Sequence, residues 1–543
     1  MNSSFEASDS LYRLVLSIQE NTEFDHPVEQ FRLLETHISY ILLTGPYAYK
    51  FKKPVDLGFL DFRTLEQRKF YCEEELRLNK RLAPELYIGV VSFTGVPDRP
   101  VLNGNGPVLE YAVRMEQFAE SEQALFLLRD GKLTNEHIEQ LARQLAQFHE
   151  CVAVAKPGSE YGEPHLVLQD AMDNFTALQP MLAGDAEYSK RLDELAAWTN
   201  RTYKETQQRF TERKQNGFIR ECHGDLHLGN IVRHRNEMLI FDCIEFSPSL
   251  HWIDVMNDLA FLIMDLHEHD QPAMAQRLLN EYLQKTGDYE GLYVLRFYLV
   301  YRALVRSKVA GIRLRQSHTE RQDIERETGN EHRYLDLART FIRPADPALI
   351  ITHGLSGSGK STVSRDLADK INAIWIRSDV ERKRLHDLQD LEQSHSGLRS
   401  GIYSAESTVN TYQRLAAVCR TLLAAGCSVI VDATFLQHQV RRSFYSIARE
   451  YGLPIIILDF QADEATLKSR LQQRGRQGRE VSEADLEVLA DQIGRQDPLD
   501  DLETQFSINI DTTSLLQMDD LKQSISMRKK QKIDAGYVDL GTA

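Results

Sequence analysis

The sequence lacks several features that mark particular classes of protein. Its 543 residues include no apolar run approaching the roughly 18 residues of a membrane span, and MNSSFEASDS at the start lacks the basic-then-apolar pattern of a signal peptide. The six cysteines show no C-x-x-C spacing, which argues against a disulfide framework or a structural zinc site. We therefore expect a cytoplasmic protein with reduced thiols and no membrane association.

An excess of positive charge is also missing. The formal net charge is −16, whereas proteins that coat nucleic acid need clustered lysines and arginines. The charge argues against nucleic acid as a general partner but leaves room for a local basic groove. No pattern in the sequence indicates an oligomeric state.

The length predicts several domains. At roughly 100–200 residues per domain, a chain of 543 residues should contain two to four. The clearest boundary is FIRPADPALI, where two prolines follow a polar helical stretch and precede an apolar run. A second boundary lies near QFAESE, where strand-like alternation gives way to helical periodicity. These boundaries divide the chain into 1–118, 119–343, 344–515 and a tail, 516–543, that we expect to be loosely ordered.

The first two segments differ in predicted secondary structure. Residues 31–53, FRLLETHISYILLTGPYAYKFKK, alternate over two runs joined by Thr-Gly-Pro-Tyr, which predicts a β-hairpin. After the second boundary the periodicity is mostly helical, as in IEQLARQLAQFH, which ends at His149. We expect His149 to be a core residue rather than a metal ligand.

The most specific motif is GLSGSGKS, which fits G-x-x-x-x-G-K-[ST] without a mismatch. The apolar ALIIT before it predicts a strand, and the four-residue spacing of apolar residues after it predicts a helix. Glycines in such a loop let backbone N–H groups surround a triphosphate at a helix N-terminus. We expect Lys360 to reach the β and γ phosphates of ATP and the Ser361 hydroxyl to bind Mg²⁺. The predicted nucleotide-binding residues are Gly354, Ser356, Gly357, Ser358, Gly359, Lys360, Ser361 and Thr362.

Acidic residues end the next two predicted strands. AIWIRSD ends with Asp379, and CSVIVDATF contains Asp432. Because the carboxyl ends of parallel strands line the ligand crevice of such sheets, both acids should lie at the edge that holds the P-loop. Asp379 with Arg382 would accept a substrate hydroxyl proton and hold an anionic group, and Asp432 would hold Mg²⁺ or the substrate.

An arginine-rich segment, RLQQRGRQGR, follows. We expect Arg470 and Arg474 to contribute to a closing lid whose cations offset charge on the transferred phosphoryl group. The alternative for each arginine is a solvated helix face.

Residues 348 to about 500 resemble the P-loop kinases that include gluconate kinases, zeta toxins and polynucleotide 5′-hydroxyl kinases. The shared features are the P-loop, SD-x-x-R at 378–382, VDATF at 431–435 and the arginine-rich lid. The resemblance implies an α/β P-loop NTPase domain with a parallel sheet, in which Asp379 serves as base or substrate anchor. The acceptor differs between branches of this group, so the resemblance does not identify it.

HGDLHLGN, at 223–230, allows two interpretations. His223, Asp225 and His227 alternate in an extended segment and could share a metal ion. The alternative is H-x-D-x-x-x-x-N, in which Asp225 deprotonates or orients an attacking hydroxyl and Asn230 binds Mg²⁺.

The phosphotransfer interpretation makes two further demands, and the sequence meets both. A second Mg²⁺-binding aspartate must end a short strand, and EMLIFD supplies Asp242. A lysine for the α and β phosphates must lie on an N-terminal strand and pair with a glutamate of the next helix. We prefer Lys50 with Glu75, although Lys52, Glu73 and Glu74 stay open. These matches favour phosphotransfer over the metal site.

Residues from about 30 to 320 resemble the aminoglycoside phosphotransferase and choline kinase branch of the protein-kinase-like fold. The resemblance rests on HGDLHLGN with IFDCIEF and on D-x-x-x-D-L-A at 254–260, which we expect to brace the catalytic loop. It departs from kinases with a glycine-rich loop, since 31–45 lacks G-x-G-x-x-G. The resemblance implies a two-lobed α+β kinase-like domain, and the order of the two halves is similar to bacterial bifunctional aminoglycoside phosphotransferase/ATP-binding proteins.

These motifs together predict an enzyme with two phosphotransferase sites, each using ATP and Mg²⁺ to phosphorylate a hydroxyl of a small molecule. Two alternatives stay open: a P-loop half that phosphorylates polynucleotide 5′-hydroxyls, and one half that only senses nucleotide. Arg302 and Arg306 lie one turn apart on a predicted helix. We interpret them as a salt-bridged helix surface rather than an anion-binding site.

Overall fold

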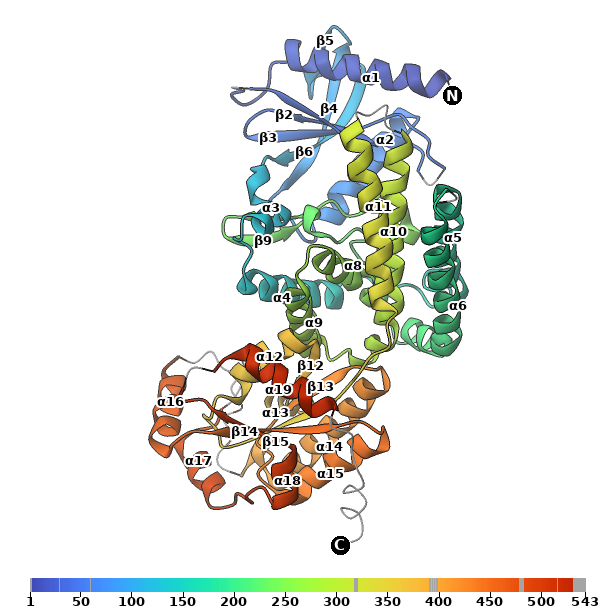
Figure 1. Ribbon diagram of the computed structural model, residues 1–543. Helices are drawn as coiled ribbons and strands as arrows, with labels where there is room; N and C mark the ends of the chain where they lie inside the picture. Colours follow the sequence, from blue (N-terminus) through green and yellow to red (C-terminus); the bar gives the residue numbers. More distant parts are fainter. Residues whose placement is uncertain are drawn as a thin grey trace. The chain divides into compact units, whose positions relative to one another are not determined.

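The structure is a computed structural model that describes residues 2–28, 30–58, 60–182, 184–316, 321–389, 392, 394, 396, 399–477, 483–514 and 516–530. The chain forms two compact units (Figure 1). The first comprises Met1–Asp265 with Phe297–Ala338, and the second comprises Leu266–Arg296 with Arg339–Ala543. Among the described helices, none is long and apolar enough to cross a membrane.

The first unit begins with an antiparallel sheet of six strands in the order β1-β2-β3-β6-β4-β5. The predicted hairpin is confirmed as β2 and β3, and β1 adds a strand to its outer edge. Helix α1 (Asn2–Asn21) packs Leu11, Val15 and Ile18 into one cluster with sheet residues, and α2 (Leu65–Asn79) packs into another. The strands are β1 (Arg32–Glu35), β2 (Ser39–Leu43), β3 (Tyr47–Lys52), β4 (Tyr87–Val96), β5 (Arg99–Leu102) and β6 (Val108–Glu116).

The rest of the first unit is mainly helical, as the periodicity predicts. Two pairs of short antiparallel strands, β7 with β10 and β8 with β9, flank the HGDLHLGN loop. The helices are α3 (Ala124–Arg129), α4 (Asn135–Cys151), α5 (Pro164–Leu182), α6 (Ala186–Gln215), α7 (Pro248–His251), α8 (Val255–Glu268), α10 (Leu292–Gln316), α11 (Arg321–Phe341), and the 3₁₀ turns η1 (Glu120–Glu122) and η2 (Leu228–Asn230). The short strands are β7 (Ile219–Glu221), β8 (Ile231–His234), β9 (Glu237–Ile240) and β10 (Trp252–Asp254).

The second unit contains a parallel sheet of five strands in the order β12-β13-β11-β14-β15. Continuous apolar runs form the central strands because both faces of the sheet are covered by helices (Figure 1). The predicted α/β fold with a parallel sheet is confirmed. The strands are β11 (Leu349–His353), β12 (Ala373–Arg377), β13 (Ser428–Asp432), β14 (Ile455–Gln461) and β15 (Ser507–Asp511). The helices are α9 (Pro272–Thr286), α12 (Lys360–Ile371), α13 (Ser378–Leu385), α14 (Ala405–Ala424), α15 (His438–Glu450), α16 (Glu464–Gln477), α17 (Leu486–Ile493), α18 (Asp501–Phe506), α19 (Met518–Lys530), and the 3₁₀ turns η3 (Tyr289–Gly291) and η4 (Gly401–Tyr403).

The expectation of a loosely ordered tail is wrong for α19. Leu521 and Ile525, one turn apart, are buried in the core cluster of the second unit. Arg528 adds a hydrogen bond of 3.1 Å from Nη2 to the backbone oxygen of Ser507. Two apolar positions in a polar sequence suffice because they lie on one helical face. The part of the predicted tail from 531 to 543 lies outside the described residues.

Residues 266–296 belong to the second unit, although the predicted division at 343 places them in the helical segment. Arg277 of α9 donates to Asp369 at 2.7 Å, and Asn280 brackets β12. The Asn280 side chain donates to the backbone oxygen of Ala373 at 3.1 Å and accepts from the backbone nitrogen of Trp375 at 2.9 Å. These contacts cover the outer edge of the sheet. The other predicted boundaries stay predictions.

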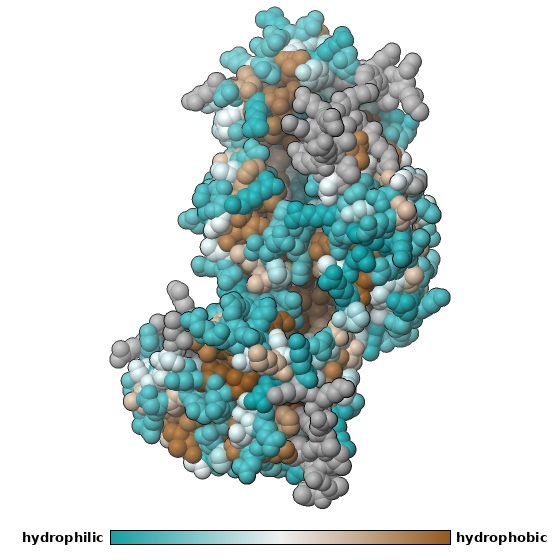
Figure 2. Space-filling model, viewed as in Figure 1, coloured by the Kyte–Doolittle hydropathy of each residue, from teal (hydrophilic) through white to brown (hydrophobic). Residues whose placement is uncertain are grey.

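Apolar side chains lie mostly inside each unit. The face in Figure 2 is dominated by hydrophilic residues, and hydrophobic residues appear on it in separate patches. The buried apolar residues of the second unit's main cluster come from the sheet strands, α12 and α19.

Candidate active sites

The HGDLHLGN loop joins β7 to β8 and presents Asp225 and Asn230 together. Asn230 donates from Nδ2 to the backbone oxygen of Asp225 at 3.0 Å and to its carboxylate Oδ2 at 3.2 Å. Asn230 is buried, whereas the Asp225 side chain is 37% exposed. Burial opposes ionisation of Asp225, but His227 and the more distant cations Arg306 and His223 outweigh it, so the pKa of this carboxyl is lowered.

The structure does not assemble the alternative three-ligand metal site. His223 is fully buried, its Nε2 lies 2.8 Å from the backbone oxygen of Phe241, and its Nδ1 accepts from the backbone nitrogen of Asp225 at 3.2 Å. His227 Nδ1 accepts from the backbone nitrogen of Gly229 at 3.0 Å. Both histidines therefore shape the loop, and His223 has no ring nitrogen left for a metal ion.

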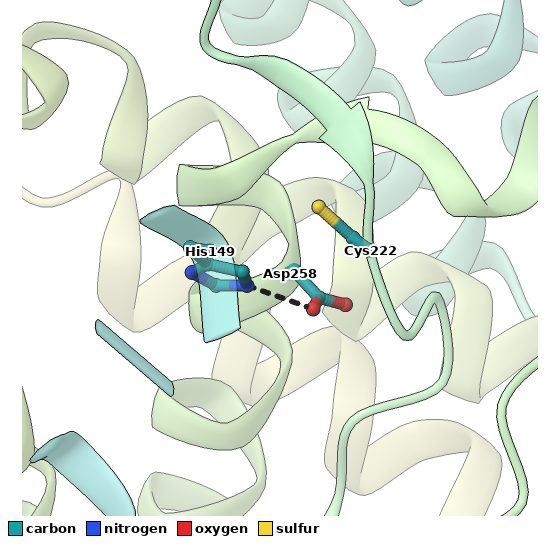
Figure 3. A group of neighbouring side chains, drawn as sticks. All are labelled: His149, Cys222 and Asp258. Carbon is teal, nitrogen blue, oxygen red and sulfur yellow. Dashed lines mark hydrogen bonds and ion pairs between the residues drawn. The ribbon is translucent and has the colours of Figure 1, made fainter. Parts of the chain in front are cut away.

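Asp258 of α8 braces this loop, as D-x-x-x-D-L-A predicts. Its carboxylate accepts from the backbone nitrogens of His223 at 3.1 Å and Gly224 at 2.9 Å. His149, a core residue as expected, lies 3.1 Å away through Nε2 (Figure 3). Burial opposes ionisation of the Asp258 carboxyl. His149, His223 and the Gly224 N–H outweigh burial and lower the pKa of Asp258 to about 2. The side chains of His149, Cys222 and Asp258 lie close enough for one ion, but these hydrogen bonds already occupy Asp258.

Arg302 supports the same loop from α10. It donates from Nη1 to the backbone oxygen of Gly224 at 3.0 Å and from Nε to Asn257 Oδ1 at 2.8 Å. Arg306, one turn later, donates from Nε to the hydroxyl of Tyr334 at 3.2 Å. The interpretation as a salt-bridged surface is therefore wrong for Arg302, which is buried and donates to a backbone carbonyl. For Arg306 it stays a prediction.

Lys50 of β3 lies between two carboxylates. Its Nζ lies 2.8 Å from Glu75 Oε1 and 2.5 Å from Asp242 Oδ1. Burial lowers the pKa of this lysine, but the two carboxylates outweigh burial and raise it well above its usual range. Glu75 is fully buried, and its two lysine neighbours lower the pKa to about 2 against the effect of burial.

Lys52 shares Glu75 with Lys50, which the sequence could not show. Lys52 Nζ lies 2.7 Å from Glu75 Oε2 and also pairs with the buried carboxylate of Glu245. Lysines two residues apart on a strand point to the same face, so both reach one glutamate. Glu73 and Glu74, the open alternatives, pair with surface cations of their own helix.

The donor set around Asp242 suits a hard cation such as Mg²⁺. Asp242 has a positive φ of 65°, its backbone N–H donates to the Tyr87 hydroxyl at 3.2 Å, and its side chain is 42% exposed. Asn230 Nδ2 makes both bonds to Asp225, and no hydrogen bond found among the described residues ends on Asn230 Oδ1. A carboxylate and an amide oxygen are ligands that Mg²⁺ accepts.

The P-loop follows β11 and precedes α12 as predicted. Gly354, Gly357 and Gly359 all have positive φ, and a Cβ at Gly354 would lie 2.6 Å from the backbone oxygen of Phe460. Lys360 is the first residue of α12, and its Nζ donates to the backbone oxygens of Leu355 at 2.7 Å and Gly354 at 3.0 Å. The loop therefore presents backbone donors and a lysine at a helix N-terminus.

Asp379 and Asp432 lie at the carboxyl ends of neighbouring strands β12 and β13. Arg377, two residues before Asp379, pairs in register with Asp432. Burial raises the pKa of Asp432, while Arg377, a hydrogen bond with Ser361 and Lys360 act against burial. The indole nitrogen of Trp375 donates to Asp432 at 3.2 Å.

These residues surround one cavity of about 510 Å³. Its walls come from the P-loop, α13, α14 and α17, and its lining residues include Lys360, Ser361, Asp379, Arg382, Asp432, Arg399 and Tyr403. Arg382 donates from Nη1 to the backbone oxygen of Ile402 at 2.9 Å. The structure therefore brings together Lys360, Ser361, Asp379 and Asp432, which the sequence predicts for the second site, from segments far apart in the chain.

Comparison with known families matches two regions of the chain. Residues 121–295 match the family described as "Phosphotransferase enzyme family", and residues 349–499 match "AAA domain". The first region is called the phosphotransferase-family domain below, and the second the AAA-type P-loop domain.

Two mycobacterial relatives match most of the chain. The uncharacterized protein Rv2004c of Mycobacterium tuberculosis is 29% identical over 480 residues, which are 87% of this chain and 92% of the relative. The uncharacterized protein Mb2027c of Mycobacterium bovis gives the same values.

Solved structures match parts of the chain. Choline kinase from Cryptosporidium parvum Iowa II is 11% identical, with 61% of this chain and 96% of that chain covered and a TM-score of 0.38. A gluconokinase from Sinorhizobium meliloti 1021 is 17% identical, with 34% of this chain and 98% of that chain covered and a TM-score of 0.24.

In the AAA-type P-loop domain, Arg470 lies behind the phosphate loop rather than in the cavity lining. Arg470 donates to the backbone oxygen of Thr512 at 2.7 Å, to its hydroxyl at 2.9 Å and to the backbone oxygen of Gly357 at 3.3 Å. Its predicted contact with a phosphoryl group stays a prediction. The Arg474 side chain lies outside the described residues.

Gln492 is a residue of this domain that the sequence analysis missed. It accepts from the backbone nitrogen of Ser356 at 2.8 Å and donates from Nε2 to the Ser356 hydroxyl at 3.0 Å. A separation of 136 residues and an ordinary helical context leave no sequence signal for this pair.

Proposed function

We propose that the chain is an enzyme with two kinase sites, each of which uses ATP and Mg²⁺ to phosphorylate a hydroxyl group of a small molecule. The observation that carries the proposal is that each domain gathers a candidate base, a candidate phosphate-binding lysine and candidate Mg²⁺ ligands in one place. These are Asp225, Lys50, Asn230 and Asp242 in the first domain, and Asp379, Lys360, Ser361 and Asp432 in the second. A cytoplasmic location, where ATP is abundant, fits this proposal.

In the phosphotransferase-family domain, Asp225 is the proposed base. Its lowered pKa keeps the carboxylate ionised at neutral pH, so it can accept the acceptor's hydroxyl proton. The acceptor oxygen forms a bond to the γ-phosphorus while the bond from that phosphorus to the bridging oxygen breaks, and ADP leaves with that oxygen. Lys50 would exchange Asp242 for the α and β phosphates.

Asn230 Oδ1 and the Asp242 carboxylate would hold Mg²⁺ in this domain. Bound Mg²⁺ offsets the charge of the phosphate oxygens. Asn230 Nδ2 meanwhile keeps Asp225 in place through its two hydrogen bonds.

In the AAA-type P-loop domain, the loop N–H groups and Lys360 would bind the β and γ phosphates. Asp379 would take the acceptor proton, with the same bond changes at phosphorus. Ser361 and Asp432, which share a hydrogen bond, would hold Mg²⁺.

The cavity of the P-loop domain favours a small acceptor over a polynucleotide. Its volume of about 510 Å³ lies in the range of sites for small molecules. Its described lining carries both acids and cations, namely Asp379, Asp432, Glu483, Asp485, Glu487 and Asp491 with Lys360, Arg377, Arg382, Arg399 and Arg495. No observation in the described residues favours a purely nucleotide-sensing role.

Two substitutions test the proposal in the full chain. Asp225→Asn should abolish one ATP-dependent phosphorylation of a metabolite extract, and Lys360→Ala should abolish another. ADP release and mass spectrometry of the products follow each reaction separately. If ADP release and product formation persist unchanged in the double variant, the proposal is wrong.

A further inference from the structure

Helix α13 has one side that lines the cavity and another side that is buried against the protein. Asp379 and Arg382 line the cavity of the P-loop domain. Glu381 lies two residues after Asp379, which places it on the far side of the helix, and it is fully buried. Whatever holds Glu381 therefore fixes the direction in which Asp379 and Arg382 point.

Three side chains hold the Glu381 carboxylate. The Tyr289 hydroxyl donates to Oε1 at 3.0 Å, and Arg414 of α14 donates from Nε to Oε2 at 2.9 Å. Arg384, one turn along α13, forms an ion pair with Oε1. A buried carboxylate needs such partners, because an unpaired buried charge lowers the free energy of unfolding by roughly several kcal/mol. Of these three partners, Tyr289 lies outside residues 349–499, which match the AAA domain.

Tyr289 belongs to η3, within the region that matches the phosphotransferase family. The segment from α9 to η3 is fixed at two further points. Asn280 brackets β12 through Ala373 and Trp375, and Arg384 donates from Nη2 to the backbone oxygen of Gln284 at 2.5 Å. Because β12 leads directly into α13, the segment holds the strand and the helix as one piece.

We infer that Tyr289 is a positioning residue for the P-loop site, which through Glu381 orients Asp379 and Arg382 toward the acceptor. The inference rests on the proposed kinase function of that site. Phosphoryl transfer depends on alignment, and a shift of about 1 Å in a reacting group can cost about 100-fold in rate. A residue of the region matched by one family thereby serves the active site of the other.

The test uses Tyr289→Phe in the full chain, with Asp225→Asn present to silence the other site. Acceptors come from a metabolite extract, and a fluorescent ADP analogue reports nucleotide binding. We expect the acceptor-dependent rate at subsaturating extract to fall about 10- to 100-fold, as for loss of a hydrogen bond to a charged group, while ADP-analogue affinity changes less than twofold. Glu381→Gln keeps the shape of the side chain. It should likewise lower the acceptor-dependent rate and leave ADP-analogue affinity nearly unchanged.

Tyr451→Phe is the matched control, because the described residues offer its hydroxyl no hydrogen bond and it lies outside the cavity lining. It should leave both readings unchanged. Equal loss of nucleotide binding and turnover in both test variants would show a merely structural role and overturn the inference, as would no loss in either. ADP release that survives Lys360→Ala in the Asp225→Asn chain would instead refute the proposed function itself.

Discussion

Asn230 donates from Nδ2 to the Asp225 carboxylate at 3.2 Å, so the proposed Mg²⁺ ligand and the proposed base are joined directly. The same nitrogen also binds the backbone oxygen of Asp225 at 3.0 Å, which leaves Oδ1 as the free end of the amide. One side chain therefore fixes the base and offers an oxygen to the metal ion.

Asn230→Asp should separate these two roles. It keeps an oxygen ligand but places a second carboxylate against Asp225, so the donor is lost and repulsion is added. We expect about a 10- to 100-fold loss of Asp225-dependent turnover and a changed Mg²⁺ requirement. ADP release by the Lys360→Ala chain, titrated with MgCl₂, measures both. Asn216→Asp, at an exposed helix end, is the control and should leave turnover and the Mg²⁺ titration unchanged. An unaltered Mg²⁺ titration for Asn230→Asp would contradict the assignment of Asn230 as a Mg²⁺ ligand.

Glu75→Gln should destabilise the first unit strongly. The substitution leaves two buried lysines, Lys50 and Lys52, without their shared counter-charge. The expected cost is about 3–5 kcal/mol in the free energy of unfolding, measured by urea denaturation.

Glu74→Gln, at the next position, provides the comparison. Glu74 pairs with Arg77 on the helix surface, and removing such a pair should cost less than about 1 kcal/mol. Similar losses for the two variants would show that the buried lysines do not depend on Glu75.

Asp258 should make the first unit sensitive to acid. Its pKa is about 2 in the fold and 3.8 in the unfolded chain, so its contribution is complete above pH 3.8 and is lost as the pH falls through 2. The contribution is on the order of 2 kcal/mol. Urea unfolding of wild type and Asp258→Asn between pH 5 and pH 2 should show the gap between them narrowing with acid. A constant gap would mean that the carboxylate's charge does not brace the loop.

Leu521→Ala should destabilise the second unit because α19 packs into its core. Truncation of this buried side chain should cost about 2–5 kcal/mol. Thermal unfolding followed by Trp375 fluorescence reports on this unit when Trp198 and Trp252, which both lie in the first unit, are replaced by phenylalanine in every variant.

Met527→Ala on the same helix is the control. Met527 is 56% exposed, so its truncation should shift the transition much less. If both variants unfold at the wild-type temperature, α19 contributes little to the core.

The sequence predicts elements of the fold where local pattern and tertiary packing agree. The strands of the parallel sheet are continuous apolar runs with both faces covered, and the β2–β3 hairpin alternates. The sequence does not predict the packing of helix α19, because only Leu521 and Ile525 mark its buried face. It does not predict the packing of 266–296 either, because the hydrogen bonds of this segment, such as that between Asn280 and Trp375, join residues 95 apart.

The same division applies to the candidate sites. Asp225 and Asn230 lie five residues apart in one motif, so their spacing already predicts that they meet. Lys50 and Glu75 could be chosen only from a short set, because several glutamates share a helix. Glu245 and Gln492 carry no local signal, since their partners lie 193 and 136 residues away.

The makeup of the second unit has a consequence for synthesis on the ribosome. Its earliest described helix, α9, is translated long before β11, and its last, α19, ends at Lys530. Elements of the first unit are complete once Ala338 has emerged, whereas α9 waits for α12 and β12, its neighbours in the second unit, and these end at Arg377. The nascent chain therefore exposes α9 from the synthesis of Thr286 until β12 has been made.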